Sequence, residues 1–312
     1  MENLLKTELG YTTLKQIGSG GGCINKGVAY ETNEGKIYVK YNTNTDARMM
    51  FDGEYESVLA IMATNSVKIP KPIKVMDLPT GGAMFVMEYV KMHQGLSKEA
   101  SLLGLQIAQM HKHNENLAKQ AKNDASNIAK KCENELTYKS QFGFHVDTCC
   151  GYFPQSNNWT SDWSEFYAKK IEFHIGKIEK DYNDHSVREL WDRVLRKYSS
   201  LFEDLDIIYP ALLHGDLWSG NISETSDGPV IFDPASFYGH SEYEFAISRM
   251  FGGFSADFFN SYHSVIPQTA RYKERLELYK LFNYLNHWNH FGSGYKGSSI
   301  NTLKNLVKFL GV

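Results

Sequence analysis

One short stretch in the second half of the chain limits its fold and chemistry more than any other. Residues 212–221 read Leu-Leu-His-Gly-Asp-Leu-Trp-Ser-Gly-Asn, and Asp233 follows the apolar run Val-Ile-Phe. Asp216 and Asn221 have the spacing of a kinase catalytic loop, with glycine where protein kinases carry arginine. Phosphoryl transfer uses one carboxylate for the acceptor proton, and an amide oxygen and a second carboxylate to hold Mg²⁺ against ATP. The pattern predicts these three roles; the alternative is a polar turn between two strands.

The composition is that of a globular protein. Of the 312 residues, 42% are hydrophobic and 22% are charged, which is ample for a core and unlike a disordered chain. The net charge of -3 gives no electrostatic reason to expect a nucleic acid or an anionic membrane as partner. No stretch approaches the ~18 apolar residues of a membrane span, and the N-terminus lacks a signal-peptide pattern. We therefore expect a cytoplasmic protein of one large or about two smaller domains.

The first forty residues read as strands around a glycine-rich turn. Apolar alternation predicts strands over 14–17, 24–32 and 36–40, with a tight turn at Asn-Glu-Gly before the last. The turn contains Gly20, Gly21 and Gly22, whose backbone N–H groups can approach phosphate oxygens because no Cβ intervenes. A glycine-rich hairpin alone is weak support for this role. Lys40 ends the third strand, where a kinase places its phosphate lysine; an exposed edge lysine is the alternative.

A helix is expected over 46–64, followed by two more strands at 73–76 and 83–90. Glu54 and Glu56 both lie on this helix. Residues two apart on a helix point about 200° apart, so only one of the two can face the preceding strand. Together these elements predict a small α+β lobe over residues 1–90, with a ligand cleft between it and the rest of the chain.

Residues 91–312 have mostly helical periodicity and predict a larger second lobe. Residues 275–291 form a strongly amphipathic and aromatic segment of this lobe, where His287 and His290 are neighbours on one helix face. No carboxylate lies at a matching position for a metal site. We therefore favour core packing or the wall of a substrate pocket for these two histidines.

A series of motifs is arranged in order along the chain. They read Tyr-Val-Lys after the glycine turn, Phe-Val-Met-Glu, Phe-Gly-Phe-His, Cys-Cys-Gly-Tyr-Phe-Pro-Gln, His-Gly-Asp-Leu-Trp-Ser-Gly-Asn, Phe-Asp-Pro-Ala-Ser-Phe-Tyr-Gly-His-Ser-Glu, Met-Phe-Gly-Gly-Phe and Leu-Phe-Asn-Tyr-Leu-Asn-His-Trp-Asn-His-Phe-Gly. This succession covers essentially the whole chain and resembles the fructosamine kinase family.

The resemblance implies an α+β, protein-kinase-like bilobal fold similar to that of the aminoglycoside phosphotransferases. It implies transfer of the ATP γ-phosphate to the 3-hydroxyl of a ketoamine, either a free ketoamine or an adduct on a glycated protein lysine. The resulting 3-phosphate breaks down and frees the amine, so the implied role is protein repair by deglycation. Two segments, Gly-Ser-Gly-Tyr-Lys-Gly-Ser-Ser and Val-Lys-Ile-Pro-Lys-Pro-Ile-Lys-Val, favour the branch that acts on ribulosamines and psicosamines. Fructosamine specificity, or a catalytically weak kinase-like binding module, are the alternatives.

Residue by residue, the resemblance makes Asp216 the proton acceptor and Asn221 and Asp233 the Mg²⁺ ligands. Lys40 matches the phosphate lysine and Glu54 its helix partner, which would leave Glu56 outside the site.

The remaining roles concern adenine, the sugar and redox chemistry. Residues of the hinge would bind adenine through their backbone: Glu88, Tyr89 and Val90. Trp218, His287 and Trp288 are expected to contact the substrate. For Cys23, in the glycine loop, the resemblance implies a redox role: the protein would be a monomer that oxidation links into a disulfide dimer. The simpler interpretation is that Cys23 is a small apolar residue filling a turn.

Overall fold

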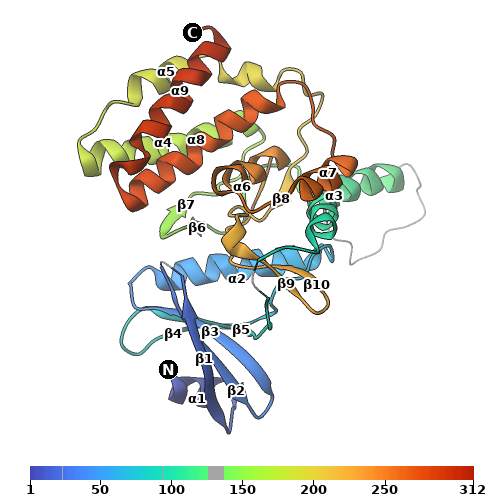
Figure 1. Ribbon diagram of the computed structural model, residues 1–312, viewed down its shortest axis with the longest axis vertical. Helices are drawn as coiled ribbons and strands as arrows, with labels where there is room; N and C mark the ends of the chain where they lie inside the picture. The colour runs from blue at the N-terminus through green and yellow to red at the C-terminus, as the bar shows by residue number, and fades with distance from the viewer. Residues whose placement is uncertain (23, 94, 126–136) are drawn as a thin grey trace.

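The N-lobe is built on one antiparallel sheet. The computed structural model describes residues 1–22, 24–93, 95–125 and 137–312 and shows two lobes, with the N-lobe lowest in Figure 1. The five strands of the sheet lie in the order β1-β2-β3-β5-β4. The elements of this lobe are α1 (Glu2–Leu9), β1 (Leu14–Gly21), β2 (Lys26–Thr32), β3 (Gly35–Asn42), α2 (Ala47–Ala63), β4 (Pro72–Asp77) and β5 (Ala83–Glu88).

Strand alternation in β3 decides which side of the sheet carries Lys40. Ile37 and Val39 are buried in an apolar cluster with Leu5 of α1. Tyr38 packs in a second cluster, with residues of α2 such as Phe51. Successive side chains of a strand point to opposite faces, so Lys40 shares the α2 side with Tyr38. The strand pattern thus brings the lysine under the helix.

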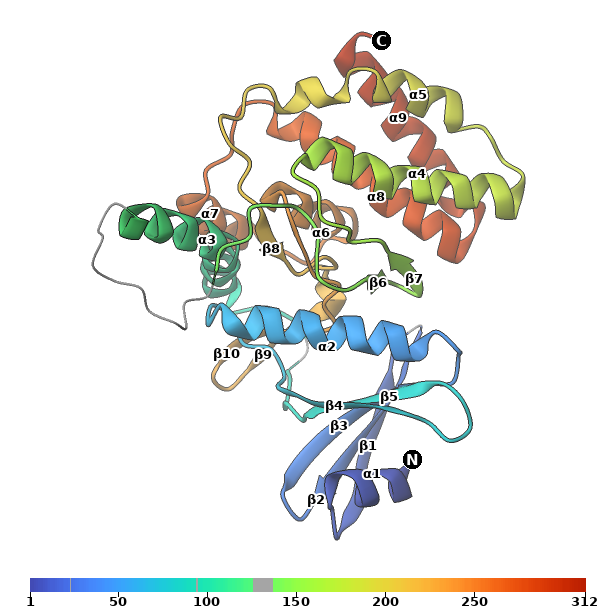
Figure 2. The ribbon, with the colours of Figure 1, turned by 180° about the vertical axis from the view of Figure 1, so that it is seen from behind.

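Helix α2 joins the two lobes. Its Val58 and Ile61 belong to the large apolar core of the C-lobe rather than to either N-lobe cluster. Gly53 allows the C-lobe to approach closely, because a Cβ at this position would lie 2.5 Å from the carbonyl oxygen of Asp147. Figure 2 shows the helix lying between the sheet and the elements of the C-lobe. The residues that face the sheet and the C-lobe are therefore held in one rigid element.

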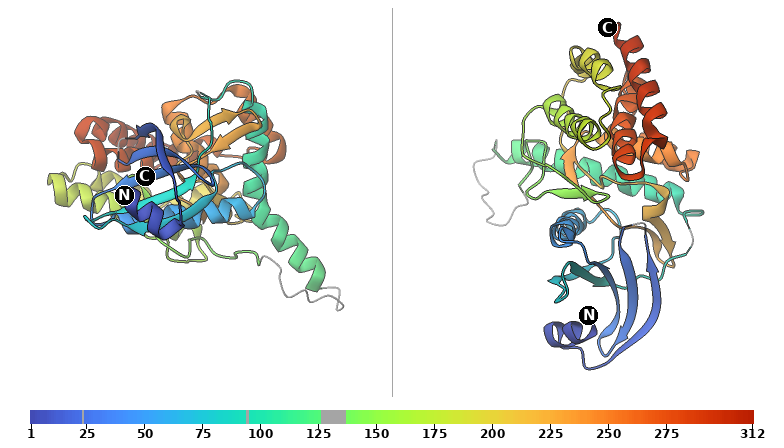
Figure 3. Two further views of the ribbon diagram at one scale, coloured as in Figure 1. Left: turned by 90° about the horizontal axis from the view of Figure 1, so that it is seen from below. Right: turned by 90° about the vertical axis from the view of Figure 1, so that its left-hand side faces the viewer.

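The C-lobe is mainly helical, and its helices are set apart from the sheet (Figure 3). Helices α7 and α9 are not anticipated from the sequence. The elements are α3 (Ala100–Ala125), β6 (Thr148–Cys150), β7 (Phe153–Gln155), α4 (Trp163–Tyr182), α5 (Arg188–Leu195), β8 (Ala211–Leu213), β9 (Ile222–Thr225), β10 (Gly228–Ile231), β11 (Phe237–Gly239), α6 (Phe245–Phe251), α7 (Ala256–Val265), α8 (Tyr272–Phe291) and α9 (Lys296–Leu310), with short 3₁₀ turns at 198–202, 219–221, 241–244 and 293–295.

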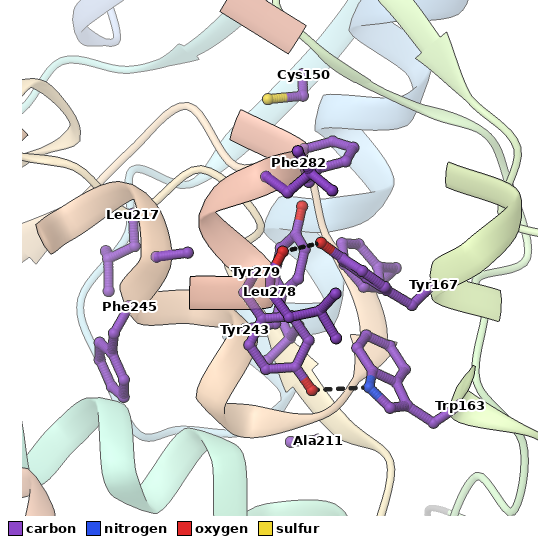
Figure 4. Close-up of a cluster of buried hydrophobic side chains, with 14 of the residues drawn as sticks. Cys150, Trp163, Tyr167, Ala211, Leu217, Tyr243, Phe245, Leu278, Tyr279 and Phe282 are labelled. Atoms are coloured by element: carbon purple, nitrogen blue, oxygen red, sulfur yellow. Dashed lines mark hydrogen bonds between the residues drawn. The ribbon is translucent and has the colours of Figure 1, made fainter. Parts of the chain in front are cut away.

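Buried aromatic residues fix α4 against α8 (Figure 4). Trp163 is buried and donates its indole N–H to the hydroxyl of Tyr279 at 2.8 Å. Tyr167 is fully buried and donates its hydroxyl to the carbonyl of Leu278 at 2.5 Å. Buried Tyr and Trp polar groups require such partners, so these bonds add orientation to apolar packing. One face of α8 is thereby anchored, and its C-terminal half is directed toward the lobe boundary.

The segment predicted to be catalytic, residues 214–236, begins and ends at two paired strands of the C-lobe. Strand β8 delivers the chain to residue 214, and β11 pairs with β8 in antiparallel register, Leu213 opposite Phe237. Between them, β9 and β10 form a hairpin with Ile222 opposite Ile231. This topology brings residues 214–221 and 232–236 together.

None of the helices in the described ranges combines the length and apolar character needed to span a bilayer.

Candidate active site

A cleft of about 830 Å³ lies between the lobes. Its walls include Lys40 and Glu54 from the N-lobe and Asp216, Asn221 and Asp233 from the C-lobe. The chain thus brings together, in one cavity, the five polar side chains that the sequence pattern singled out. Their roles in catalysis stay predictions.

Lys40 makes the central ion pairs of this cleft. Its Nζ lies 2.7 Å from both carboxylate oxygens of Glu54 and 3.0 Å from Oδ1 of Asp233. Burial disfavours the charged ammonium, but the carboxylates of Asp233 and Glu54 outweigh this and raise the pKa of Lys40. Glu56 instead contacts His145 at 2.9 Å, outside the cleft. The lysine is therefore a fixed cation that links the two lobes.

A buried glutamate holds the start of the catalytic loop. Glu244 accepts the backbone N–H of His214 at 2.5 Å and of Gly215 at 2.9 Å. It also contacts Nε2 of His111 at 3.3 Å. Burial alone would raise the pKa of Glu244, but His111 and these donors outweigh burial and lower it. Glu244 therefore stays ionised beneath the loop, a role that no pattern in the sequence indicated.

Gly215 and His214 set the direction of the loop. Gly215 has φ +84°, and a Cβ there would lie 2.1 Å from the carbonyl oxygen of Ala235. The ring of His214 is fully buried; its Nε2 contacts the carbonyl of Phe232 at 2.9 Å, and its Nδ1 accepts the N–H of Asp216 at 3.2 Å. The neutral ring of His214 thus connects the Asp216 loop to the segment that precedes Asp233. At position 215 only glycine combines the positive φ with the close approach of Ala235.

Asp216 is positioned by its neighbour in the loop. The side-chain amide of Asn221 donates to Oδ2 of Asp216 at 3.0 Å and to its carbonyl at 2.9 Å. Burial raises the pKa of Asp216 to about 7, and the negative charges of Asp233 and Glu244 add to the rise. A carboxylate whose pKa lies near the working pH is well suited to accept a proton in the transition state.

This pKa predicts an acid limb in the activity. Below pH about 7 the carboxyl of Asp216 is protonated before the acceptor binds, and it cannot accept a proton. We therefore expect kcat/KM to fall tenfold for each pH unit below that value, measured with saturating ATP and limiting acceptor. A limb near pH 4, the usual aspartate value, would show that the burial of Asp216 does not govern the reaction.

The oxygen ligands for a divalent cation are available. The side-chain nitrogen of Asn221 donates to Asp216, and within the described ranges the side-chain oxygen of Asn221, which lines the cleft, accepts no hydrogen bond. Asp233 has φ +59°, an uncommon backbone conformation for a residue with a side chain, and its carboxylate is 44% exposed. Mg²⁺ is typically held by one or two protein oxygens together with substrate phosphates and water. In the described part of the chain no group of three or more His, Cys, Asp or Glu residues is arranged for a metal ion.

The glycine loop and hinge line the nucleotide end of the cleft. Gly21 and Gly22 line the cavity, while Gly20 lies one position back in β1. Glu88, Tyr89 and Val90 also line the cavity. The N–H of Tyr89 is already donated to Lys36 at 3.2 Å, whereas that of Val90 has no partner within the described ranges. Val90 is therefore the hinge residue best able to donate to an adenine ring. The predicted redox residue, Cys23, lies outside the described residues.

Trp218 and His287, which are predicted to contact the substrate, both line the cleft. Trp218 is 36% exposed and lies edge-on to Phe251, with ring centroids 5.9 Å apart. Gly220 makes room for it, because a Cβ there would lie 2.2 Å from the indole ring. The Nδ1 of His287 contacts the carbonyl of Asn283 at 2.7 Å, which makes Nδ1–H the donor and Nε2 a free acceptor.

The prediction that Trp288 contacts substrate is wrong. Its side chain is fully buried in the C-lobe core and does not line the cleft. The residues of α8 that line the cleft are Asn286, His287, His290 and Phe291, whereas Trp288 packs on the other side of the helix, in the core of the C-lobe. Both ring nitrogens of His290 have hydrogen-bond partners: Nδ1 donates to the carbonyl of Asn286, and Nε2 accepts the N–H of Tyr152. This agrees with packing and pocket wall rather than metal ligation.

Comparisons with known proteins decide the family. The fructosamine kinase family model matches residues 2–309. A ketosamine-3-kinase of Mus musculus is 53% identical over 311 residues, covering 99% of this chain and 100% of the relative. The chain belongs to the fructosamine kinase family. A chloroplastic protein-ribulosamine 3-kinase of Oryza sativa subsp. indica is 40% identical over 294 residues, covering 93% of this chain and 78% of the relative. The resemblance drawn from the motifs is confirmed.

A solved structure supports the fold of this family member. A thermostable mutant of the aminoglycoside phosphotransferase APH(4)-Ia, in a ternary complex with ADP and hygromycin B, superposes with a TM-score of 0.60. The two chains are 14% identical, and the match covers 99% of this chain and 97% of the other. At this identity the likeness shows the fold alone. The predicted kinase-like α+β architecture is confirmed.

Proposed function

We propose that this protein is an ATP-dependent kinase that phosphorylates the 3-hydroxyl of ketoamines, with ribulosamine and psicosamine adducts on glycated lysines as its substrates. The observation that carries the proposal is Asp216, a buried carboxylate held by Asn221 in the same cleft as the Lys40–Glu54 pair. The names of the mouse and rice relatives support the substrate class.

Each step depends on a residue of the cleft. Lys40 binds the ATP phosphates, and the backbone of Gly21, Gly22 and Val90 positions the nucleotide. Asp216 accepts the proton of the 3-hydroxyl while that oxygen attacks the γ-phosphorus. The bond between this phosphorus and the bridging oxygen breaks, and ADP leaves with the electron pair.

A magnesium ion held by Asn221 and Asp233 would neutralise charge on the phosphate oxygens. The ketoamine 3-phosphate formed by the reaction is unstable and breaks down, which frees the amine. The consequence for a glycated protein is the return of an unmodified lysine. The complete polar set in the cleft favours this activity over a binding module that has lost catalysis.

Sugar preference is tested by three substrates in parallel. We expect ATP consumption with ribuloselysine and psicoselysine, and much slower consumption with fructoselysine, each measured as kcat/KM by coupled ADP release. Equal turnover of fructoselysine would overturn the sugar preference. Absence of turnover with all three would contradict kinase activity and favour the binding module.

Redox control by Cys23 is a further part of the proposal. We expect peroxide to lower activity, a disulfide dimer to form on a non-reducing gel, and reductant to restore the active monomer. The thiols of Cys149 and Cys150 are poor candidates, since burial raises the pKa of Cys149 to about 12 and also raises the pKa of Cys150 well above its usual value. A Cys23→Ala protein that loses activity with peroxide as the parent does would contradict this role. A cytoplasmic, reducing setting is part of the proposal.

A further inference from the structure

Five aromatic rings form a continuous series along the C-lobe wall of the cleft. They are Trp218, Phe251, His287, Phe291 and Tyr295. The ring centroids of Phe251 and His287 are 5.1 Å apart, and Trp218 lies 5.9 Å from Phe251. His287 lies 5.5 Å from Phe291 and 5.1 Å from Tyr295. The series therefore begins within the catalytic loop and ends after α8.

Three of these rings are unusually open to solvent for large apolar side chains. Phe291 is 57% exposed, Phe251 is 41% exposed and Trp218 is 36% exposed. Exposed apolar residues that are scattered singly need no explanation, but a contiguous group of them marks an interaction site. Here the group lies in the same cavity as the catalytic carboxylate. We therefore expect these exposed rings to contact the substrate that receives the phosphoryl group.

The charges around the cleft limit what that occupant can be. Among the described lining residues, the ionised side chains are those of the N-lobe together with Asp216 and Asp233. Within that set, the wall formed by α6, α8 and residues 149–151 carries none. Burial lowers the pKa of His287 and lowers that of His290 to about 4, so both rings are neutral at physiological pH. A cation of the acceptor would meet neutral rings here, and no lysine or arginine belongs to this wall among the described lining residues.

We propose that these five rings form an aromatic cage for the protonated amine of the ketoamine, and that the cage makes the enzyme select amine-linked ketoses over neutral ones. The inference rests on the proposed function. In a ketoamine the nitrogen is attached to C1, only three carbons from the 3-hydroxyl oxygen. With that oxygen at Asp216, the nitrogen lies close to the loop that carries Trp218, and the lysine stem leaves past Phe291.

Aromatic faces attract ammonium groups through the ring quadrupole, and the attraction grows where water is excluded. The outer position of Phe291 leaves the cage open on the side where a protein or a free amine would continue. The cage thus recognises the amine, a group that every ketoamine carries, and is indifferent to the rest of the molecule to which that amine belongs.

A matched pair of substrates separates this recognition from apolar stacking. The first is ribuloselysine, and the second is its thioether analogue, in which sulfur replaces the protonated nitrogen. The quantity measured is the ratio of kcat/KM for the amine to kcat/KM for the thioether. We expect Phe291→Leu and Phe251→Leu to lower this ratio by about 2- to 30-fold each, mainly through the KM of the amine. Phe309→Leu, which changes a 49%-exposed phenylalanine of α9 outside the cleft, should leave the ratio unchanged.

These measurements separate a failure of the aromatic cage from a failure of the proposed kinase activity. If the parent turns over ribuloselysine but Phe291→Leu and Phe251→Leu leave the ratio unchanged, the cage is overturned and the kinase activity stands. An equal loss of kcat/KM for both substrates would also overturn it, since the rings would then contact the apolar stem or sugar alone. If the parent turns over neither compound, the proposed function itself fails and the cage fails with it.

Discussion

Replacing Asp216 by asparagine is expected to lower kcat by about 10²- to 10⁴-fold, the usual contribution of a general base. The amide cannot accept the hydroxyl proton, but it keeps the size of the carboxylate and its contact with Asn221. Nucleotide binding should therefore survive. The measurements are the single-turnover rate with ribuloselysine and the Kd of ATP by calorimetry.

The matched control is Asp227→Asn. This aspartate lies in the turn of the β9–β10 hairpin, where its exposed carboxylate accepts the hydroxyl of Ser226 at 2.9 Å and lies 3.3 Å from Nζ of Lys68. The variant loses the same charge a short way along the chain, and its activity should equal that of the parent. If Asp216→Asn also retained full activity, Asp216 would have no part in proton transfer.

The second large effect is expected at Glu244. Glu244→Leu leaves two buried N–H groups, of His214 and Gly215, without their acceptor and removes the contact with His111. Unsatisfied buried donors and a broken buried pair cost about 2–5 kcal/mol in unfolding free energy. Urea denaturation would measure this loss, and kcat should fall as well because the loop carrying Asp216 loses its support.

Glu244→Gln is the graded comparison, because its amide oxygen can still accept one of the two N–H groups. We expect a loss of stability between those of the parent and Glu244→Leu. A Glu244→Leu protein with the parent's denaturation midpoint and kcat would show that the glutamate does not support the loop.

The sequence predicted those parts of the site that local patterns encode. Asp216, Asn221 and Asp233 lie close together in the sequence. The pairing of β8 with β11 and of β9 with β10 then brings them together in space. Helix geometry allowed only one of Glu54 and Glu56 to face the sheet, and the structure places Glu54 there. In these cases the periodicity of one element decides which side chain enters the cleft.

Other parts depend on contacts that no single element encodes. Glu244 acts on backbone N–H groups some thirty residues earlier, where side-chain identity gives no signal. Gly27 is required because a Cβ there would lie 1.8 Å from the hydroxyl of Tyr38, a clash between two strands. A motif assigns Trp288 to the substrate, although its position on α8 directs it into the core. Only the packed structure separates such neighbours.

The position of the transferred phosphate tests the proposed reaction most directly. Ribuloselysine is incubated with ATP and the protein, and the early product is identified by phosphorus and carbon NMR while release of the free amine is monitored. We expect phosphate on O3, then loss of phosphate and recovery of unmodified lysine, with phosphate transfer slowed by about 10²- to 10⁴-fold in Asp216→Asn. Phosphate on another hydroxyl, or ATP hydrolysis without a phosphorylated sugar, would contradict a ketoamine 3-kinase.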